Sequence, residues 1–336
     1  MIEQALQQVE AGRDLAMDEM SAVIGLVMDG RCDEDQVGRL LLGLRKKGET
    51  VAEVAGAAAA MRRHMTPIRT RRTGVIDVVG TGGDASGTFN ISTAAALVTA
   101  AAGVPVAKHG NRRFTSRTGA ADVLAELGVN IEADVATVEA CLDELGVCFC
   151  FAPLLHQAMR HVGPVRKKLG VPTIFNLLGP LANPAGAARQ LLGVGRPELR
   201  PLLSEALLML GSERVLVVHG CDGLDEVTTA GPTYVTEAAG GQLREFQWQP
   251  ADFGLERGDR EPLLVEGPAQ SAQVIRDTFA GKPGGPRDVV VANAAAALWT
   301  AGRDASLQTC ARLAAEAIDS GAAAALCARL VERTQG

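Results

Sequence analysis

The chain has 336 residues, of which 47% are hydrophobic and 21% charged, and its formal net charge at pH 7 is −6. These values are typical of a globular protein with one large or two ordinary domains, and no apolar run is long enough to span a bilayer. The negative net charge disfavours a general nucleic-acid-binding role, and the first residues lack the basic and apolar regions of an export signal.

The seven cysteines are scattered without the spacing of a zinc site. Cys148 and Cys150 alternate within an apolar run at 147–151, a pattern typical of buried thiols. We therefore expect a cytoplasmic protein that binds neither a membrane nor a nucleic acid.

The first seventy residues show apolar side chains at helical spacing and no strand pattern. Apolar stripes recur at 20–28 and 37–44, while Asp33 with Gln36 and Thr50 with Glu53 stand where reciprocal N-caps belong. The pattern predicts a small all-helical N-terminal domain over residues 1–70. Because so short a segment should not bury all its apolar side chains alone, we expect part of its surface to pair two copies as a homodimer.

From residue 71 the pattern changes to alternating strands and helices. Strands are predicted at 75–79, 104–108, 147–151 and 214–218, a β-hairpin at 233–247, and a pair of helices after residue 306. Strand–helix alternation predicts a mostly parallel sheet. The expected class is therefore α/β, with a large α/β domain over residues 71–336.

The first of these strands runs into a glycine-rich loop, Gly80-Thr-Gly-Gly-Asp84, and an alanine-rich helix follows the run Asn90-Ile-Ser-Thr93. Glycine lets backbone N–H groups approach a bulky anion, and a helix start adds unpaired N–H groups and the positive end of a dipole. The arrangement predicts a phosphate or pyrophosphate site. A dinucleotide site is disfavoured because the next strand ends in Lys108 instead of an acid, and no Gly-Lys-Ser/Thr completes a nucleotide loop.

Two further clusters carry charge beside expected turns. Between Lys108 and Ser116, cations precede hydroxyls, which suits phosphate oxygens, although a solvated basic turn is the alternative. Asp225 and Glu226 follow the buried strand at 214–218, at the strand end where ligands gather in parallel sheets. Their oxygens suit Mg²⁺, with ordinary surface acids as the alternative.

A third cluster runs from His156 to Arg166 and continues through a segment broken by glycine and proline. The planar fork of an arginine on such a hinge is suited to clamping a carboxylate. The residue pattern by itself leaves open whether Arg166 does so.

Taken together, these segments resemble the anthranilate phosphoribosyltransferase family. The strings that carry the resemblance are Gly80-Thr-Gly-Gly-Asp84, Phe89-Asn-Ile-Ser-Thr93, Lys108-His-Gly-Asn-Arg112, Asp225-Glu226 and Thr173-Ile-Phe-Asn-Leu-Leu-Gly-Pro-Leu181. Pyrimidine nucleoside phosphorylases share the glycine motif, whereas the strings from Lys108 and from Thr173 are far more specific to the anthranilate enzymes. The resemblance extends over practically the whole chain.

The resemblance implies a helical domain, with a contribution from about 164–190, that dimerises, and a large domain of the nucleoside phosphorylase class III type. It also implies a reaction in tryptophan biosynthesis. The 5-phosphoribosyl group of phosphoribosyl pyrophosphate (PRPP) is transferred to the amine of anthranilate, which gives N-(5-phosphoribosyl)anthranilate and pyrophosphate. One or two Mg²⁺ ions are the implied cofactor.

The resemblance also assigns the site residues. Lys108, Asp225 and Glu226 would act through electrostatics and a metal, without a strong general base, and the metal ligands would be Ser92, Asp225 and Glu226. The residues implied for PRPP are Gly80, Thr81, Gly82, Gly83, Asp84, Thr88, Asn90, Ile91, Ser92, Thr93, Lys108, Arg112, Thr115 and Ser116. Those implied for anthranilate are Gly80, His109, Asn111, Arg166 and Gly179.

Some positions depart from the family pattern. Ala120 stands where a serine often contacts phosphate, Gln157 replaces a usual proline, Pro172 replaces a usual arginine, and the loop at 266–270 matches poorly. Two alternatives remain. A pyrimidine nucleoside phosphorylase would share the fold and the glycine loop, and a non-enzymatic nucleic-acid-binding relative would have a basic face and no need of Asp225 and Glu226.

Overall fold

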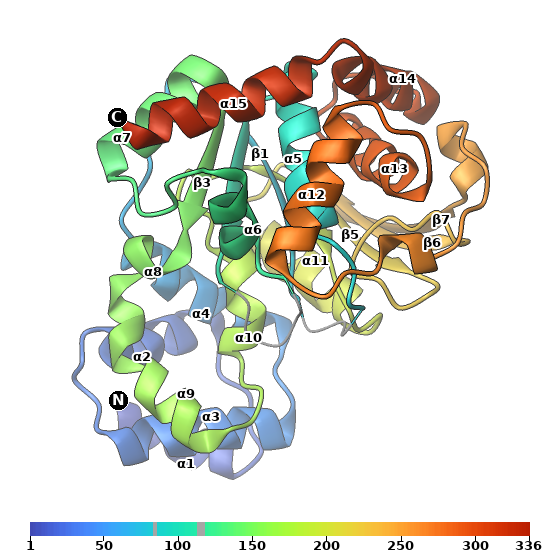
Figure 1. The fold of residues 1–336 in the computed structure, drawn as a ribbon. Coiled ribbons are helices and arrows are strands. Elements are labelled where there is room, and N and C mark those ends of the chain that lie inside the picture. Colours follow the sequence, from blue (N-terminus) through green and yellow to red (C-terminus); the bar gives the residue numbers. More distant parts are fainter. Residues whose placement is uncertain (83–85, 113–117) are drawn as a thin grey trace.

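The computed structural model describes residues 1–82, 86–112 and 118–336. The chain begins with the helices α1 (Ile2–Glu10), α2 (Met17–Met28), α3 (Glu34–Lys47) and α4 (Val51–Arg63). Two later helices, α9 (Gly163–Leu169) and α10 (Phe175–Leu178), lie among them in the lower part of Figure 1. We call these six helices the helical bundle.

The predicted N-caps of α3 and α4 are confirmed. The Gln36 N–H donates to Asp33 Oδ1 at 2.8 Å, and the Asp33 N–H donates to Gln36 Oε1 at 3.2 Å. Thr50 and Glu53 form the same reciprocal pair, with donor–acceptor distances of 3.3 and 2.9 Å. Each pair satisfies N–H groups that the start of a helix would otherwise leave without a partner, so these two helices begin where the sequence predicts.

The apolar stripes of α2 and α3 are buried within a single chain. Nine of their apolar residues are at most 3% exposed: Met20, Val23, Ile24, Val27, Met28, Val37, Leu40, Leu41 and Leu44. The same hydrophobic cluster contains Val165, Phe175 and Leu178 of the bundle and Leu203 of α11 (Leu199–Met209). The expectation that a second copy of the chain covers part of these stripes was therefore wrong for these residues, because residues beyond 160 supply the covering surface that residues 1–70 lack.

Seven strands form one sheet in the described residues, in the order β3-β2-β1-β4-β5-β6-β7. Their bounds are β1 Ile76–Gly80, β2 Val106–Gly110, β3 Val147–Phe151, β4 Arg189–Gly193, β5 Arg214–Gly220, β6 Thr233–Ala239 and β7 Gln242–Trp248. The pairs from β3 to β5 are parallel, and β6 and β7 add an antiparallel hairpin. The α/β class, the mostly parallel sheet and the predicted hairpin are thus confirmed.

The sheet also differs from the prediction. The first two strands start one and two residues later than expected, and β4 was missed; it begins inside the segment that was expected to be helical. Leu191 of β4 packs in the hydrophobic cluster on one face of the sheet and Leu192 packs in the cluster on the other. The strand Arg189-Gln-Leu-Leu-Gly193 contains only two apolar residues, which are adjacent, and so few residues show neither the alternation of a strand nor an apolar run.

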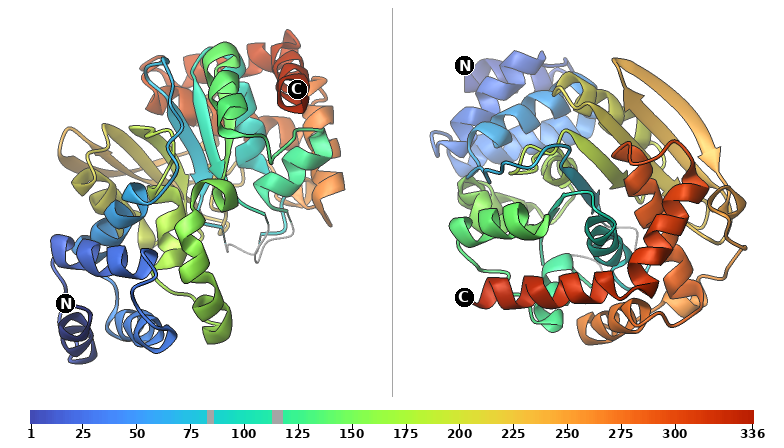
Figure 2. Two further views of the ribbon diagram at one scale, coloured as in Figure 1. Left: turned by 90° about the vertical axis from the view of Figure 1, so that its left-hand side faces the viewer. Right: turned by 90° about the horizontal axis from the view of Figure 1, so that it is seen from above.

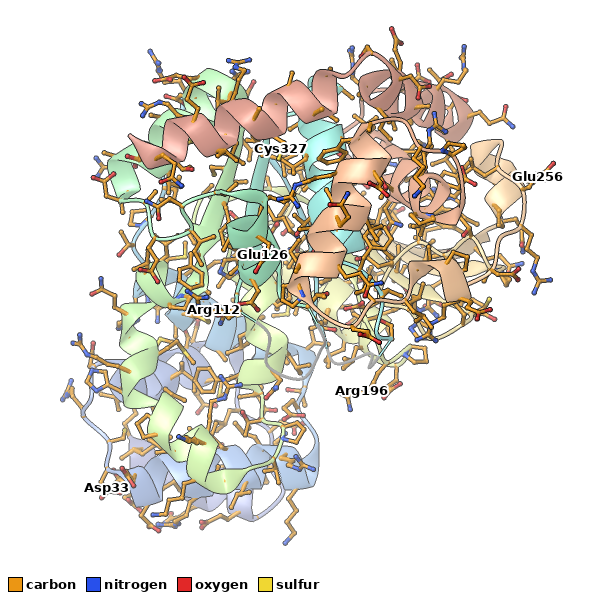
Figure 3. The ribbon with its side chains drawn as sticks, in the orientation of Figure 1. Asp33, Arg112, Glu126, Arg196, Glu256 and Cys327 are labelled. Carbon is orange, nitrogen blue, oxygen red and sulfur yellow. The ribbon has the colours of Figure 1, made fainter. Side chains whose placement is uncertain are left out.

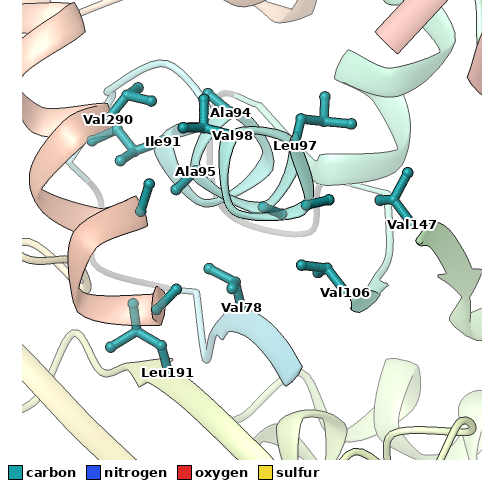
Figure 4. Packing of buried hydrophobic residues seen from close by; sticks show 14 of the residues in the cluster. Val78, Ile91, Ala94, Ala95, Leu97, Val98, Val106, Val147, Leu191 and Val290 are labelled. Carbon is teal, nitrogen blue, oxygen red and sulfur yellow. The ribbon is translucent and has the colours of Figure 1, made fainter. Parts of the chain in front are cut away.

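Helices cover both faces of the sheet (Figure 2). On one face, Ile91 and Ala95 of α5 (Ile91–Ala101) lie over Val78 of β1, with Val290 of α13 (Gly285–Thr300) beside them (Figure 4). Three further helices pack against α5 and α13 on this side of the sheet: α12 (Pro268–Phe279) and the predicted helix pair, α14 (Leu307–Asp319) and α15 (Ala322–Gln335). The other face packs against α11 and the helical bundle.

Shorter elements connect these layers. They are α6 (Ala120–Leu127), α7 (Val135–Ala140) with a π-helical turn at Cys141–Leu145, α8 (Ala152–Leu155), and the 3₁₀ turns η2 (Gln157–His161), η3 (Gly179–Leu181), η4 (Pro250–Phe253) and η5 (Glu261–Leu263). Of the helices in the described part of the chain, none combines the length and apolar character that a membrane span requires.

The strand order reverses between β1 and β4. These strands are neighbours, but the chain continues from β1 towards β2 and from β4 towards β5, on the opposite side. Such a reversal leaves a crevice at the carboxyl ends of the strands, where ligands of open α/β sheets bind. The paired residues at these two ends are Gly80 and Gly193. We therefore expect the ligand site at the carboxyl ends of β1 and β4.

Candidate functional site

Asp225 lies across the carboxyl ends of β1 and β4. Its Oδ2 accepts the Gly82 N–H at 3.0 Å. A Cβ atom on Gly80 would lie 2.5 Å from Asp225 Oδ2, and one on Gly193 would lie 2.5 Å from the carbonyl carbon of Asp225 and closer still to its oxygen. The two glycines therefore make room for the loop that follows β5, which brings Asp225 and its neighbour Glu226 to the reversal point.

Lys108 lies inside β2 and not in the loop after it, and it is only 4% exposed. Its Nζ donates to the Val78 carbonyl at 2.7 Å and to Ser92 Oγ at 3.0 Å. One buried ammonium thus joins β2, β1 and the first turn of α5. The prediction that Lys108 belongs to a strand is confirmed, although this strand, β2, continues two residues further, to Gly110.

This ammonium lies among carboxylates. Burial lowers the pKa of Lys108, and attraction to Asp77, Glu226 and Asp225 acts in the opposite direction. Asp77 on β1 is fully buried, and this burial raises its pKa to about 6, while its Oδ1 accepts the His109 N–H at 3.1 Å. The edge of the sheet therefore combines one buried cation with several acids, a distribution suited to a metal ion and a polyphosphate.

The first turn of α5 completes this edge. Asn90 is the N-cap residue, and its Oδ1 accepts the Thr93 N–H at 3.1 Å and the Ser92 hydroxyl at 3.4 Å. This bond orients the start of the helix, so Ser92 Oγ faces Lys108. A hydroxyl next to an ammonium at a helix N-terminus is a favourable place for an anion.

His109 connects β2 to the segment that leads into the helical bundle. His109 Nδ1 lies 3.0 Å from the Gly179 carbonyl, and its Nε2 lies 3.1 Å from His156 Nε2. Burial lowers the pKa of His109 to about 3 and that of His156 to about 4, so both rings are neutral at pH 7. Since a carbonyl only accepts, His109 carries its proton on Nδ1 and accepts through Nε2 the proton of His156 Nε2.

Arg166 on α9 contacts the same segment. Its Nη2 donates to Asn176 Oδ1 at 3.3 Å, and its guanidinium lies 5.8 Å from the centre of the Phe175 ring. Burial lowers the pKa of Arg166, which nevertheless remains a cation at neutral pH. Because α10 runs directly into Gly179, Arg166 and His109 contact the two ends of one short stretch of chain.

The comparisons with known proteins agree with this geometry. Residues 3–65 match the helical bundle domain, and residues 72–324 the a/b domain, of the family described as a glycosyl transferase family. The chain is 51% identical over 319 residues to an anthranilate phosphoribosyltransferase of Rhodopirellula baltica, which covers 95% of this chain and 93% of that protein. It is 52% identical over 326 residues to that of Rhodospirillum rubrum, with coverages of 97% and 94%. The chain belongs to the anthranilate phosphoribosyltransferase family.

Solved structures of the family share the fold. The anthranilate phosphoribosyltransferase of Thermus thermophilus superposes with a TM-score of 0.93 at 43% identity, covering 99% of both chains. The Saccharomyces cerevisiae enzyme, solved in complex with PRPP and Mg, gives a TM-score of 0.90 at 28% identity and covers 99% of this chain and 98% of that one. An anthranilate phosphoribosyltransferase with PRPP and Mg bound therefore has the same fold as this chain.

The structure brings together many of the residues that the resemblance assigned to PRPP, but some of them form hydrogen bonds within the protein. The Thr81 N–H donates to the Gly193 carbonyl at 2.9 Å, and the Gly82 N–H donates to Asp225. The Arg112 guanidinium lies below α6 (Figure 3), 3.5 Å from Asp122 and 3.4 Å from Glu132. Four of the assigned residues lie outside the described residues: Gly83, Asp84, Thr115 and Ser116. The individual roles stay predictions.

Three of the departures from the family pattern lie at the following places in the structure. Ala120 opens α6, and Gln157 is an exposed residue of η2. The Pro172 carbonyl accepts a hydrogen bond of 2.7 Å from Arg45 Nη1, which ties the segment before α10 to α3.

Oxygen atoms at the strand edge fit Mg²⁺. Asp225, Glu226 and Ser92 offer two carboxylates and a hydroxyl, the hard donors that this ion prefers. Gly82 and Lys108 hold the Asp225 carboxylate and the Ser92 hydroxyl in place. No cluster of three or more His, Cys, Asp or Glu side chains able to hold a metal occurs among the described residues, so an ion here would take further ligands from a substrate or water.

Proposed function

We propose that this chain binds PRPP at the carboxyl ends of β1, β4 and β5 and transfers its 5-phosphoribosyl group to the amine of anthranilate in tryptophan biosynthesis. The observation that carries the proposal is the meeting of Lys108, Ser92 and Asp225 at the strand reversal. It is supported by 51% identity to a named anthranilate phosphoribosyltransferase over nearly the full chain.

Stabilising the leaving group is the main catalytic task. As pyrophosphate departs, positive charge develops at C1 and O4 of the ribose and negative charge on the pyrophosphate. Lys108 would donate to this charge from a position already fixed by Val78 and Ser92, so little reorganisation accompanies the reaction. The amine of anthranilate is a neutral nucleophile at pH 7, which is consistent with the absence of a strong base from the assigned roles.

Asp225, Glu226 and Ser92 would hold one or two Mg²⁺ ions. When bound, Mg²⁺ neutralises charge on the pyrophosphate oxygens. The contribution of the chain is to orient these ligands, since Asp225 is packed against Gly80 and Gly193 and bonded to Gly82.

Anthranilate would lie between β2 and the segment around α10. Arg166 would bind its carboxylate through two parallel donors, and His109, Asn111 and Gly179 would line the same place. The neutral His109 would hold the Gly179 carbonyl in position without adding charge next to the amine.

We also propose a cytoplasmic homodimer that associates through the N-terminal helical domain, residues 1–70 with 164–190, while residues 71–336 form the PRPP-binding domain. Because the stripes of α2 and α3 are covered, the contact must use outward residues such as Leu42, which is 45% exposed. Light scattering at micromolar concentration should give about twice the chain mass of 35.0 kDa. A particle of the chain mass would rule the dimer out.

Two parallel assays test the function. One follows anthranilate with PRPP and Mg²⁺, and the other follows uridine or thymidine with inorganic phosphate. The proposal predicts turnover of the first pair only. Phosphorolysis of a nucleoside would identify a pyrimidine nucleoside phosphorylase, and inactivity in both assays together with nucleic-acid binding would identify a non-enzymatic relative.

A further inference from the structure

Arg260 bonds two loops that are far apart in the sequence. Its Nη1 donates to the Asp222 carbonyl at 3.2 Å, and its Nη2 donates to the Ser86 carbonyl at 2.6 Å. Asp222 precedes Asp225 in the loop after β5, and Ser86 begins the stretch that leads to Ser92. A single half-buried guanidinium therefore connects the acid-bearing loop to the start of α5.

The loop that contains Asp222 is held internally. Asp222 Oδ2 accepts the Thr228 hydroxyl at 2.9 Å, and the Gly220 N–H donates to the Leu224 carbonyl at 2.9 Å. A Cβ atom on Gly220 would lie 2.6 Å from Asp222 Oδ1, so the turn is closely packed. The Asp222 carbonyl that accepts from Arg260 therefore lies in a loop whose conformation is fixed by its own hydrogen bonds.

The segment that contains Arg260 lies along the other loop. The Phe89 N–H donates to the Leu263 carbonyl at 2.8 Å, and the Val265 N–H donates to the Gly87 carbonyl at 2.9 Å. Thr88 and Leu264 form an antiparallel bridge between these hydrogen bonds. Residues 86–89 are therefore aligned by residues 260–265, and the guanidinium extends this alignment to the acid-bearing loop.

We propose that Arg260 is a positioning residue that fixes residues 86–92 against residues 222–226 and so prepares the PRPP site before the substrate binds. A loop that must be ordered on binding consumes binding free energy, whereas a loop already fixed does not. Hydrogen bonds from a charged donor are about twice as strong as neutral ones, and the arginine fork reaches two carbonyls at once. This inference rests on the proposed function, because it assumes that these two loops hold PRPP and its metal.

The test compares Michaelis constants for the two substrates. Arg260→Gln should raise the KM for PRPP about tenfold or more, the effect of losing one charge-assisted hydrogen bond, and should leave the KM for anthranilate near its wild-type value. A merely structural defect would instead lower kcat by reducing the fraction of active enzyme, with both constants unchanged. Arg260→Lys keeps the charge but not the fork, so its KM for PRPP should stay close to that of Arg260→Gln.

Arg257→Gln is the matched control, because it removes an exposed arginine three residues earlier in the same segment. It should show the wild-type KM for PRPP. The inference is overturned if Arg260→Gln keeps the wild-type constant, if Arg260→Lys restores it, or if Arg257→Gln raises it equally.

The proposed function fails separately, if the wild-type protein consumes no anthranilate with PRPP and Mg²⁺. In that case calorimetric titration of PRPP with Mg²⁺ into the wild-type protein and Arg260→Gln still decides the inference. Binding about tenfold weaker in Arg260→Gln supports it, and equal affinities overturn it.

Discussion

Gly193→Ala should disable the site through a single methyl group. The added Cβ would lie 2.5 Å from the Asp225 carbonyl carbon, whereas an ordinary contact begins at 3.4 Å, so the backbone of Asp225 must move. A displacement of about 1 Å in a positioned catalytic group can lower the rate about 100-fold, which corresponds to about 2.7 kcal/mol of transition-state stabilisation. We expect kcat/KM for PRPP to fall by at least that factor. The free energy of unfolding should fall by about 3 kcal/mol or more, the upper end of the usual cost of one overpacked methyl group, because the clash is with backbone atoms.

The assay is the loss of anthranilate fluorescence at varied PRPP and fixed Mg²⁺, with urea denaturation as the measure of stability. Gly163→Ala is a suitable control, since a Cβ on Gly163 would meet no atom within 4 Å. It should retain wild-type kinetics. A Gly193→Ala enzyme that is folded and within about threefold of the wild-type kcat/KM would refute the reasoning, because it would show that Asp225 tolerates displacement.

Three other predictions follow from the same geometry. Replacing both acids, Asp225→Asn with Glu226→Gln, should leave the protein folded by circular dichroism and slow Mg²⁺-dependent turnover roughly a thousandfold; near-normal turnover at low Mg²⁺ would make them surface acids. Arg166→Ala should raise the KM for anthranilate about ten- to a hundredfold and change that for PRPP little, with only partial rescue by Arg166→Lys; the opposite pattern would move Arg166 to the phosphate site. The pKa values of His109 and His156 are lowered to about 3 and about 4, so below pH 6.5 the unfolded chain binds more protons than the folded chain. The free energy of unfolding should therefore fall as the pH decreases towards 4, by about 1.4 kcal/mol per pH unit for each histidine. The pKa of Asp77, which is raised to about 6, has the opposite effect and offsets the contribution of one histidine below pH 6. When the free energy of unfolding from denaturation curves is plotted against pH, His156→Gln should therefore give a smaller slope than the wild type. Equal slopes would contradict a lowered pKa for His156.

Much of the fold was predictable because it depends on local signals. The caps at Asp33 and Thr50 fix the starts of two helices, and the turn at Gly240 and Gly241 fixes the hairpin, within a few residues of sequence. The alternation of strands and helices was enough to predict the parallel sheet. Specific strings of residues, above all the one from Lys108, indicated the family before any contact was known.

The remainder depends on contacts between distant segments. The family resemblance implied a helical contribution from about 164–190, but no residue near α2 or α3 shows that α9 and α10 cover their apolar stripes, so part of these stripes was assigned to a partner copy. Gly193 ends a strand that was missed, and its role is visible only once Asp225 lies against it. Asp77 offered a signal, an acid in an apolar strand, but its burial beneath Lys108 and its bond to His109 required the assembled sheet.

Metal-dependent transfer to anthranilate can be measured as the rate of anthranilate fluorescence loss with PRPP and Mg²⁺, recorded with and without a chelator. We expect steady consumption of anthranilate with equimolar release of pyrophosphate, arrest when the chelator is added, and recovery when Mg²⁺ is supplied in excess. Consumption at the same rate in the presence of the chelator would contradict the role of Ser92, Asp225 and Glu226. Absence of any consumption with both substrates and Mg²⁺ would contradict the function itself.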